Sequence, residues 1–138
     1  MYEKWGGLIM NLGDYFENTE GFGVLATADA EGRVDAAVYS RPHVVDEATV
    51  AFIMAEKLTH HNLKANPHAV YLFRESRPGY VGIRLYLTKL REERDSPAIE
   101  QLRRKKHGLG HDEQRTRFLV FFRVDKVLPL TGSEPATE

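Results

Sequence analysis

The sequence contains no cysteine, which excludes disulfide bonds, a thiol nucleophile and thiolate metal ligands. No apolar run approaches the length that spans a bilayer, and residues 1–7 lack the charged and then apolar pattern of a secretory signal. The formal net charge is only −1, so the overall field does not favour a polyanionic partner such as nucleic acid. We therefore expect a soluble cytoplasmic protein that binds neither nucleic acid nor membrane.

The sequence also lacks the common motifs of catalysis and nucleotide binding. It has no Walker loop, no dinucleotide glycine pattern and no Ser-His-Asp order. Two glycines interrupt the segment between His107 and His111, and the adjacent side chains of His60 and His61 point in different directions, so the histidine pattern does not favour a metal site. Any redox chemistry would therefore belong to a bound cofactor.

Apolar segments with a period of two residues predict strands along most of the chain. With 42% hydrophobic residues among 138, one core can form, and we expect a single domain over residues 1–130 and a disordered tail over residues 131–138. Mostly short connections favour an antiparallel barrel over a parallel sheet. The expected strands are residues 22–27, 33–41, 49–54, 69–73, 80–90 and 117–128, and the expected helices are residues 8–19, a segment within 57–67, and one that opens at Ser96-Pro97.

The short polar segment of residues 57–67 lies between two expected strands and carries the strongest functional signal. A helix that begins here presents unpaired backbone N–H groups and the positive end of its dipole. The Lys57 ammonium, the Thr59 hydroxyl and the Asn62 amide lie on the same segment, and Asn66-Pro67 ends it. We interpret this segment as a site that can hold a phosphate.

A simpler interpretation assigns no ligand to this helix. Thr59 would then be only the N-cap, the two histidines that follow it would face solvent, and Leu58 and Leu63 would pack in the core. The helix by itself fits both interpretations, so the neighbouring segments have to decide between them.

The segments around this helix follow a particular order. Residues 23–27 read Gly-Val-Leu-Ala-Thr and precede a turn of small residues at 29–32, and residues 35–41 form the next strand. After a further strand, residues 62–67 read Asn-Leu-Lys-Ala-Asn-Pro. This order, over roughly residues 21–73, resembles the pyridoxamine 5'-phosphate oxidase-like family of FMN-binding split β-barrels, and the later strands fit in order and length.

The resemblance implies a mainly β fold, a six-stranded antiparallel split β-barrel with a few flanking α-helices. It implies FMN as the cofactor, with haem as the alternative used by another branch of split barrels. It also implies a homodimer that holds the flavin between its two barrels. Five aromatic residues agree with such a dimer surface, or equally with ordinary sheet surface: Tyr39, Tyr71, Tyr80, Tyr86 and Phe121.

By the same resemblance, one strand end lies along the flavin ring and the start of the helix holds the phosphate. The oxidases carry a basic pair where this chain has Leu58 and Thr59, so Lys57 and Arg41 remain the candidates for a charge-assisted contact. No counterpart of the oxidases' C-terminal substrate motif is present, and oxidation of pyridoxamine phosphate itself is not expected. The implied cofactor contacts are Val38, Tyr39, Ser40, Arg41, Lys57, Leu58, Thr59 and Asn62.

Three functional hypotheses follow from these residues. The first is an FMN-dependent oxidoreductase that acts on an unidentified small molecule or electron donor. The second is a flavin- or haem-binding carrier or sensor without turnover. The third is a cofactor-free interaction dimer, for which Leu58 in place of a base is the best sequence argument.

A basic run, Arg103-Arg104-Lys105-Lys106, follows Ser96-Pro97 in the third expected helix. The acidic residues Asp95 and Glu100 lie close to it in sequence, and the total charge of the chain is nearly neutral. We therefore interpret the run as a solvated helix face and not as a nucleic-acid patch.

Overall fold

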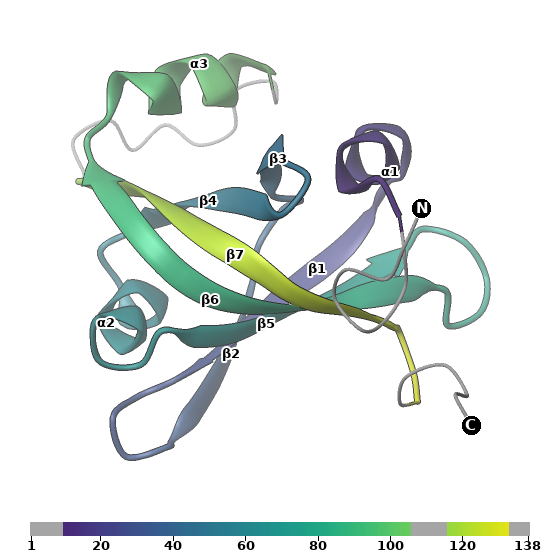
Figure 1. The fold of residues 1–138 in the computed structure, drawn as a ribbon, viewed down its shortest axis with the longest axis horizontal. Coiled ribbons are helices and arrows are strands. Elements are labelled where there is room, and N and C mark those ends of the chain that lie inside the picture. The colour runs from purple at the N-terminus through teal and green to yellow at the C-terminus, as the bar shows by residue number, and fades with distance from the viewer. Residues whose placement is uncertain (1–9, 106–115, 133–138) are drawn as a thin grey trace.

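The computed structural model describes residues 10–105 and 116–132 (Figure 1). Within these residues the chain forms three helices and seven strands. The helices are α1 (Leu12–Asn18), α2 (Leu58–Ala65) and α3 (Pro97–Lys105). The strands are β1 (Gly21–Ala28), β2 (Val34–Val38), β3 (His43–Asp46), β4 (Thr49–Ala55), β5 (His68–Glu75), β6 (Gly82–Arg94) and β7 (Arg117–Pro129).

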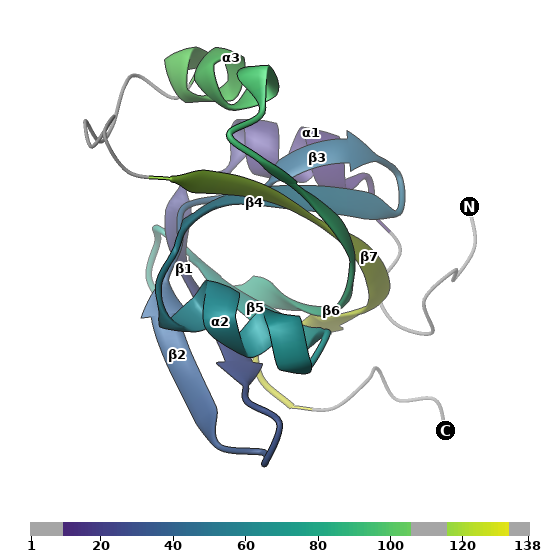
Figure 2. The ribbon, with the colours of Figure 1, turned by 90° about the vertical axis from the view of Figure 1, so that its left-hand side faces the viewer.

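The strands form one antiparallel sheet in the order β2-β1-β5-β6-β7-β4-β3. β2 and β3 are consecutive in sequence but lie at opposite edges of this sheet. The four residues between them, 39–42, can span at most about 18 Å, so the two edges have to come close together. The sheet accordingly curls into a barrel that is not closed by pairing, and residues 39–42 cross its split (Figure 2). We call residues 39–42 the crossing segment.

Alternation along the strands fills the interior of the barrel with large apolar side chains. Tyr71, Phe73 and Phe122 are fully buried, and the Phe52 ring meets that of Phe122 edge to face with centroids 5.9 Å apart. Each large apolar side chain contributes about 1.5–3 kcal/mol by leaving water. Tyr71 therefore belongs to the core and lies on neither of the two surfaces expected for it, a dimer surface or ordinary sheet surface.

Each helix covers a different part of the barrel. α1 buries Leu12 and Phe16 in the main core. α3 buries Ile99 against Ala51 and Leu119, on β4 and β7. α2 lies at one end of the barrel, close to β1, β2 and β4 (Figure 2). The end of the barrel at which β4 stops is thus also where α2 begins.

The sequence located most elements correctly, with one error in the strands. β2 ends at Val38, before the expected end at Arg41, and β3 (His43–Asp46) was not expected from the sequence. Pro42, which has no N–H group to donate to a ladder, falls in the crossing segment. The sheet therefore has seven strands where six were expected.

At the N-terminal side, α1 begins at Leu12 after the N-cap Asn11, whose side-chain oxygen accepts a hydrogen bond from the Asp14 N–H group at 3.0 Å. The first residues expected in that helix, Leu8 and Ile9, lie outside the described residues. So do residues 133–138 of the expected tail and the histidines at 107 and 111.

Gly23→Ala tests whether the space beside the Tyr71 ring requires a glycine at position 23. A Cβ atom at position 23 would lie 1.9 Å from the Tyr71 hydroxyl oxygen and 2.3 Å from its ring Cζ. We expect this substitution to lower the free energy of unfolding by about 3 kcal/mol in urea denaturation. Gly13→Ala is the matched control, because the nearest atoms to its Cβ would lie at 3.3 and 3.9 Å, and it should change stability by less than about 1 kcal/mol. Equal losses of stability from the two substitutions would show that Tyr71 leaves room for a side chain at position 23.

Candidate functional site

The crossing segment is held at Tyr39 by three neighbouring elements. The Tyr39 N–H group donates to the Gly23 carbonyl oxygen of β1 at 3.0 Å. The Tyr71 hydroxyl of β5 donates to the Tyr39 carbonyl oxygen, also at 3.0 Å. The Tyr39 hydroxyl shares a hydrogen bond with the side chain of Thr59, in the first turn of α2. Tyr39 thus joins β1, β5 and α2 at the split.

Both tyrosine hydroxyls of this arrangement stay protonated at neutral pH. Burial raises the pKa of Tyr71 well above its usual range, although the nearby charge of Arg41 acts in the opposite direction. Burial also raises the pKa of Tyr39, and the hydrogen bond with Thr59 opposes that rise. The Tyr71 hydroxyl therefore remains a donor to the crossing segment.

Arg41, in the same segment, contacts the end of α1. Its Nη1 atom donates to the carbonyl oxygens of Phe16 and Thr19, at 2.8 Å each. Carbonyls at a helix C-terminus carry the negative end of the dipole, and a guanidinium is a favourable partner for them. Arg41 thus fastens α1 to the crossing segment.

The first turn of α2 presents backbone donors to its surroundings. Lys57 is the N-cap residue, and its side chain makes no capping hydrogen bond. In the part of the chain that the structure describes, the N–H groups of Leu58, Thr59 and His60 have no hydrogen-bond partner, whereas the N–H group of His61 donates to the Lys57 carbonyl oxygen at 2.9 Å. Three unpaired donors at the positive end of the helix dipole favour an anion.

The side chains of this turn do not follow the simpler, ligand-free interpretation of the helix. The N-cap is Lys57 and not Thr59. His60 is buried, although it was expected to face solvent, and Leu58 is 55% exposed, although it was expected in the core. Of the two leucines expected in the core, only Leu63 is buried. The apolar face of α2 is therefore rotated relative to that expectation.

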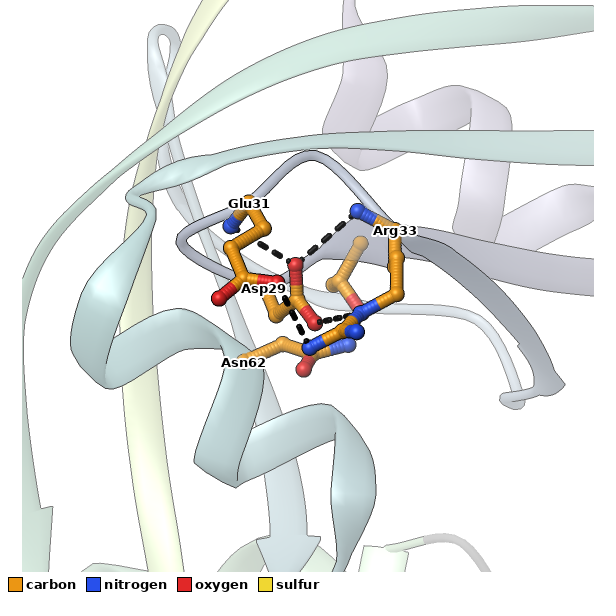
Figure 3. Close-up of polar contacts among 5 residues, drawn as sticks. Asp29, Glu31, Arg33 and Asn62 are labelled. Carbon is orange, nitrogen blue, oxygen red and sulfur yellow. Dashed lines mark hydrogen bonds and ion pairs between the residues drawn. The ribbon is translucent and has the colours of Figure 1, made fainter.

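Asn62 connects α2 to β1. Its Nδ2 atom donates to the Thr27 Oγ1 atom at 3.0 Å, and both side chains are buried. Figure 3 shows Asn62 beside the turn between β1 and β2, where the Asp29 carboxylate accepts hydrogen bonds from the backbone N–H groups of Glu31 and Arg33. The Arg33 side chain and these backbone donors lower the pKa of Asp29 to about 2. The Asn62 amide thus serves to position α2.

His60 anchors the start of α2 to β6. Its ring stacks on Phe118 with centroids 3.7 Å apart, and its Nε2 atom lies 3.0 Å from Glu92 Oε1. Lys89 Nζ donates to the same carboxylate oxygen at 2.8 Å. Burial acts to raise the pKa of Glu92, but the hydrogen bonds from Lys89 and His60 outweigh it and hold the pKa below its usual range. Glu92 is therefore ionised at neutral pH.

A pocket of about 140 Å³ opens beside the crossing segment. Tyr39 and Phe52 both line it, and their rings meet edge to face with centroids 5.8 Å apart. The pocket is lined by Tyr39, Ser40, Arg41, His43, Phe52, Ile53 and Arg103. Three expected cofactor contacts therefore lie at this pocket, while Lys57, Leu58 and Thr59 lie at the start of α2.

Four residues of this lining were not among the candidates from sequence: His43, Phe52, Ile53 and Arg103. Arg103 belongs to the basic run interpreted as a solvated face, yet its side chain is only 17% exposed. A signal for it was present, because Arg103 follows the buried Ile99 by four residues and so lies on the same face of α3. That face packs on the barrel.

The described residues contain no cluster of three or more His, Asp or Glu side chains placed to hold a metal ion. Among the same residues, no helix has the length and apolar character needed to cross a membrane.

Several solved structures share this architecture. An FMN-binding protein from Syntrophomonas wolfei superposes with a TM-score of 0.70 at 17% identity, over 90% of this chain and 86% of that one. An F420 reductase gives 0.68 at 16% identity, over 83% and 94%. HupZ from group A Streptococcus gives 0.65 at 18% identity, over 94% and 100%. No protein-family model and no curated protein matches the sequence.

The chain has the split-barrel fold of these structures. The fold expected from residues 21–73 is thereby confirmed, with seven strands in place of six. In this split barrel the first turn of α2 offers an anion three unpaired backbone donors, with the exposed Lys57 next to them. Leu58 supplies no charge there.

Glu92→Gln tests the anchor of α2 in the split barrel. Because the pKa of Glu92 is lowered in the folded protein, its carboxylate stabilises the fold above the unfolded pKa of about 4.3, and this contribution is lost as the pH falls through the folded pKa. The substitution should therefore reduce the free energy of unfolding by about 1 kcal/mol at pH 7 and by less at pH 3, since the side chain is 27% exposed.

The measurement is urea denaturation at both pH values. Glu56→Gln is the control, because Glu56 is exposed just before α2, and it should change stability by less than about 0.5 kcal/mol at either pH. A loss from Glu92→Gln that does not depend on pH would contradict the role of the charged carboxylate.

Proposed function

We propose that this protein is a cytoplasmic homodimer that binds FMN and acts as an oxidoreductase on a small molecule. The observation that carries the proposal is the first turn of α2, with three unpaired backbone donors and Lys57 beside the split of the barrel. The fold, which an FMN-binding protein from Syntrophomonas wolfei shares, supports it.

In this proposal the FMN phosphate accepts hydrogen bonds from the N–H groups of Leu58, Thr59 and His60. The Lys57 ammonium supplies the charge that Leu58 does not, and charge-assisted hydrogen bonds are roughly twice as strong as neutral ones. Arg41 and Asn62 act indirectly, because their hydrogen bonds hold α1 and β1 around the site.

The flavin ring lies against the crossing segment, at the backbone of Val38, Tyr39 and Ser40. The Ser40 N–H group has no hydrogen-bond partner among residues 10–105 and 116–132, so it is available to a polar edge of the ring. FMN supplies hydride or one-electron transfer when bound. The protein's part is to orient the ring, to exclude water from one face and to set the reduction potential through such donors.

The second subunit is proposed to cover the outer face of β2, β1 and β5. Val38, Val34, Phe22 and Leu72 are 65%, 81%, 56% and 37% exposed. The strand register places Val24 opposite both Val38 and Leu72, so these apolar side chains form a continuous row. Exposed apolar surface of this kind on a sheet is typical of a protein interface.

The absorbance spectrum of the purified protein tests the cofactor. A flavin spectrum, or binding of added FMN, supports the proposal. A Soret band would identify haem instead, and colourless protein that ignores FMN would leave a cofactor-free dimer. Reduction of the bound flavin by a nicotinamide donor then separates an oxidoreductase from a carrier or sensor.

Lys57→Glu tests the phosphate end of the site. It should weaken FMN binding at least tenfold and leave riboflavin binding within about twofold, because only FMN carries the phosphate that Lys57 neutralises. Flavin fluorescence quenching gives both affinities. Lys64→Glu, with the same charge change at the other end of α2, should alter neither. Equal losses for FMN and riboflavin would show that Lys57 does not face the phosphate.

Leu72→Glu tests the proposed dimer face. Leu72 is at the β5 end of the apolar row, opposite Arg84 of β6. A carboxylate there would have to lose its water on dimerisation, so we expect a monomer where the unmodified chain is a dimer. Light scattering after size-exclusion chromatography measures the mass. Val45→Glu is the matched control, because Val45 is 52% exposed on β3, outside this face. A dimer that persists with Leu72→Glu would place the interface elsewhere.

A further inference from the structure

The outward-facing side chains of β1 become smaller along the strand. Burial alternates residue by residue, and the outward positions are, in order, Phe22, Val24, Ala26 and Ala28. The Phe22 side chain is 56% exposed. One end of this face therefore carries a protruding aromatic ring, and the other end carries only methyl groups.

A hollow of about 440 Å³ lies at the end with the small side chains. Ala26 and Ala28 belong to its lining, and larger residues line it from the neighbouring strands: Val34 of β2, Val70 of β5 and Tyr86 of β6. A cavity of about 150 Å³ already accommodates benzene. The hollow therefore has room for a phenylalanine side chain and for parts of the residues beside it.

A symmetric dimer places each surface patch of one copy against the same surface of the other copy. If the two-fold axis runs across the strands, it reverses the direction of β1, so opposite ends of the face meet. An axis above Leu25 places Phe22 of one copy over Ala28 of the other, because both residues are three positions from Leu25. Leu25 is the register partner of Ala37 in β2 and of Tyr71 in β5, so this axis follows one row across the sheet.

An axis along the strands gives a poorer fit. It would set the two hollows at the same level and the two Phe22 rings at the other, so nothing would fill the hollows. Unfilled space forfeits the contacts of the atoms that line it, whereas the centres of stable interfaces are packed as densely as protein interiors. Packing therefore favours the axis across the strands.

The face is large enough for a stable dimer. The eight residues of β1 extend about 26 Å, and four adjacent strands, β2, β1, β5 and β6, are about 19 Å wide. Each copy thus offers about 500 Å² before the relief of its side chains is counted. Two copies bury about 1,000 Å² or more, which is the size that a specific interface requires.

We propose that the protein pairs with a second copy of itself so that Phe22 of each copy occupies the hollow over Ala28 of the other. This inference rests on the homodimer of the proposed function, and it adds the direction of the symmetry axis and the contact that fixes it. It does not depend on FMN.

Phe22→Ala and Ala28→Phe test this contact in the full-length protein. The first change leaves the hollows empty and the second fills them, so each should weaken dimerisation at least about a hundredfold, because the contact occurs twice in the dimer. Analytical ultracentrifugation over a dilution series measures the dissociation constants. Val45→Ala is the matched control, because Val45 is 52% exposed on β3, and it should change the dissociation constant by less than about twofold.

A mixture of the two variants tests the pairing directly. In the mixed dimer, the alanine introduced at position 22 faces the phenylalanine introduced at position 28, and the unmodified Phe22 and Ala28 face each other. The mixture should therefore dimerise at least about tenfold more tightly than either variant alone. Misfolded variants would not recover in this way. If both variants melt cooperatively and the mixture still does not recover, the proposal is wrong.

The outcomes separate this inference from the proposed function. A dimer that is weakened by Leu72→Glu but not by the changes at positions 22 and 28 uses the same face with another axis, which refutes only this inference. Dimerisation that none of the three changes weakens refutes the proposed dimer face as well. A monomer at every concentration of the unmodified chain refutes the homodimer itself, and titration of that chain with FMN tests the cofactor separately.

Discussion

The hydrogen bond from the Tyr71 hydroxyl to the Tyr39 carbonyl oxygen, 3.0 Å long, is the contact on which the site depends. It fixes a short segment that leaves one edge of the sheet and reaches the other without being part of a ladder. Tyr71 can reach that carbonyl only because Gly23 has no side chain, since a Cβ there would overlap the hydroxyl. A glycine in β1 and a tyrosine in β5 thus together set the path of the chain across the split.

The split in turn gives the barrel two neighbouring regions of positive potential. One is the first turn of α2, where the charge is partial and comes from backbone N–H groups beside Lys57. The other is the pocket, where it comes from the guanidinium groups of Arg41 and Arg103. β4 connects them, because Ile53 lines the pocket and α2 begins five residues later at Leu58, so the two regions are at most about 18 Å apart along the chain.

Prediction from the sequence worked best for strands that bury one face and expose the other, because their apolar and polar residues then alternate. β6 and β7 alternate clearly between apolar and polar residues, so their periodicity located them. The prediction of one strand over residues 33–41 was wrong, because the crossing segment shows no hydrophobic periodicity that would mark the end of β2. Its path is set instead by hydrogen bonds to Gly23 and Tyr71, which are distant in sequence. The sequence also did not identify Arg103 as a pocket residue, because a run of basic residues has the same sequence pattern whether its side chains face water or a neighbouring strand.

The sequence alone located six of the seven strands, the helix after β4 and the order that resembles the flavin-binding split barrels, since these depend on local periodicity, capping and turn residues. It also supplied the uncharged Leu58 in the first turn of that helix. Only the tertiary structure decided what each polar side chain contacts. Arg41 binds the end of α1, Asn62 binds β1, and Arg103 reaches the pocket, because the partners of a side chain are set by which distant strands the sheet brings together and not by the residues beside it in the chain.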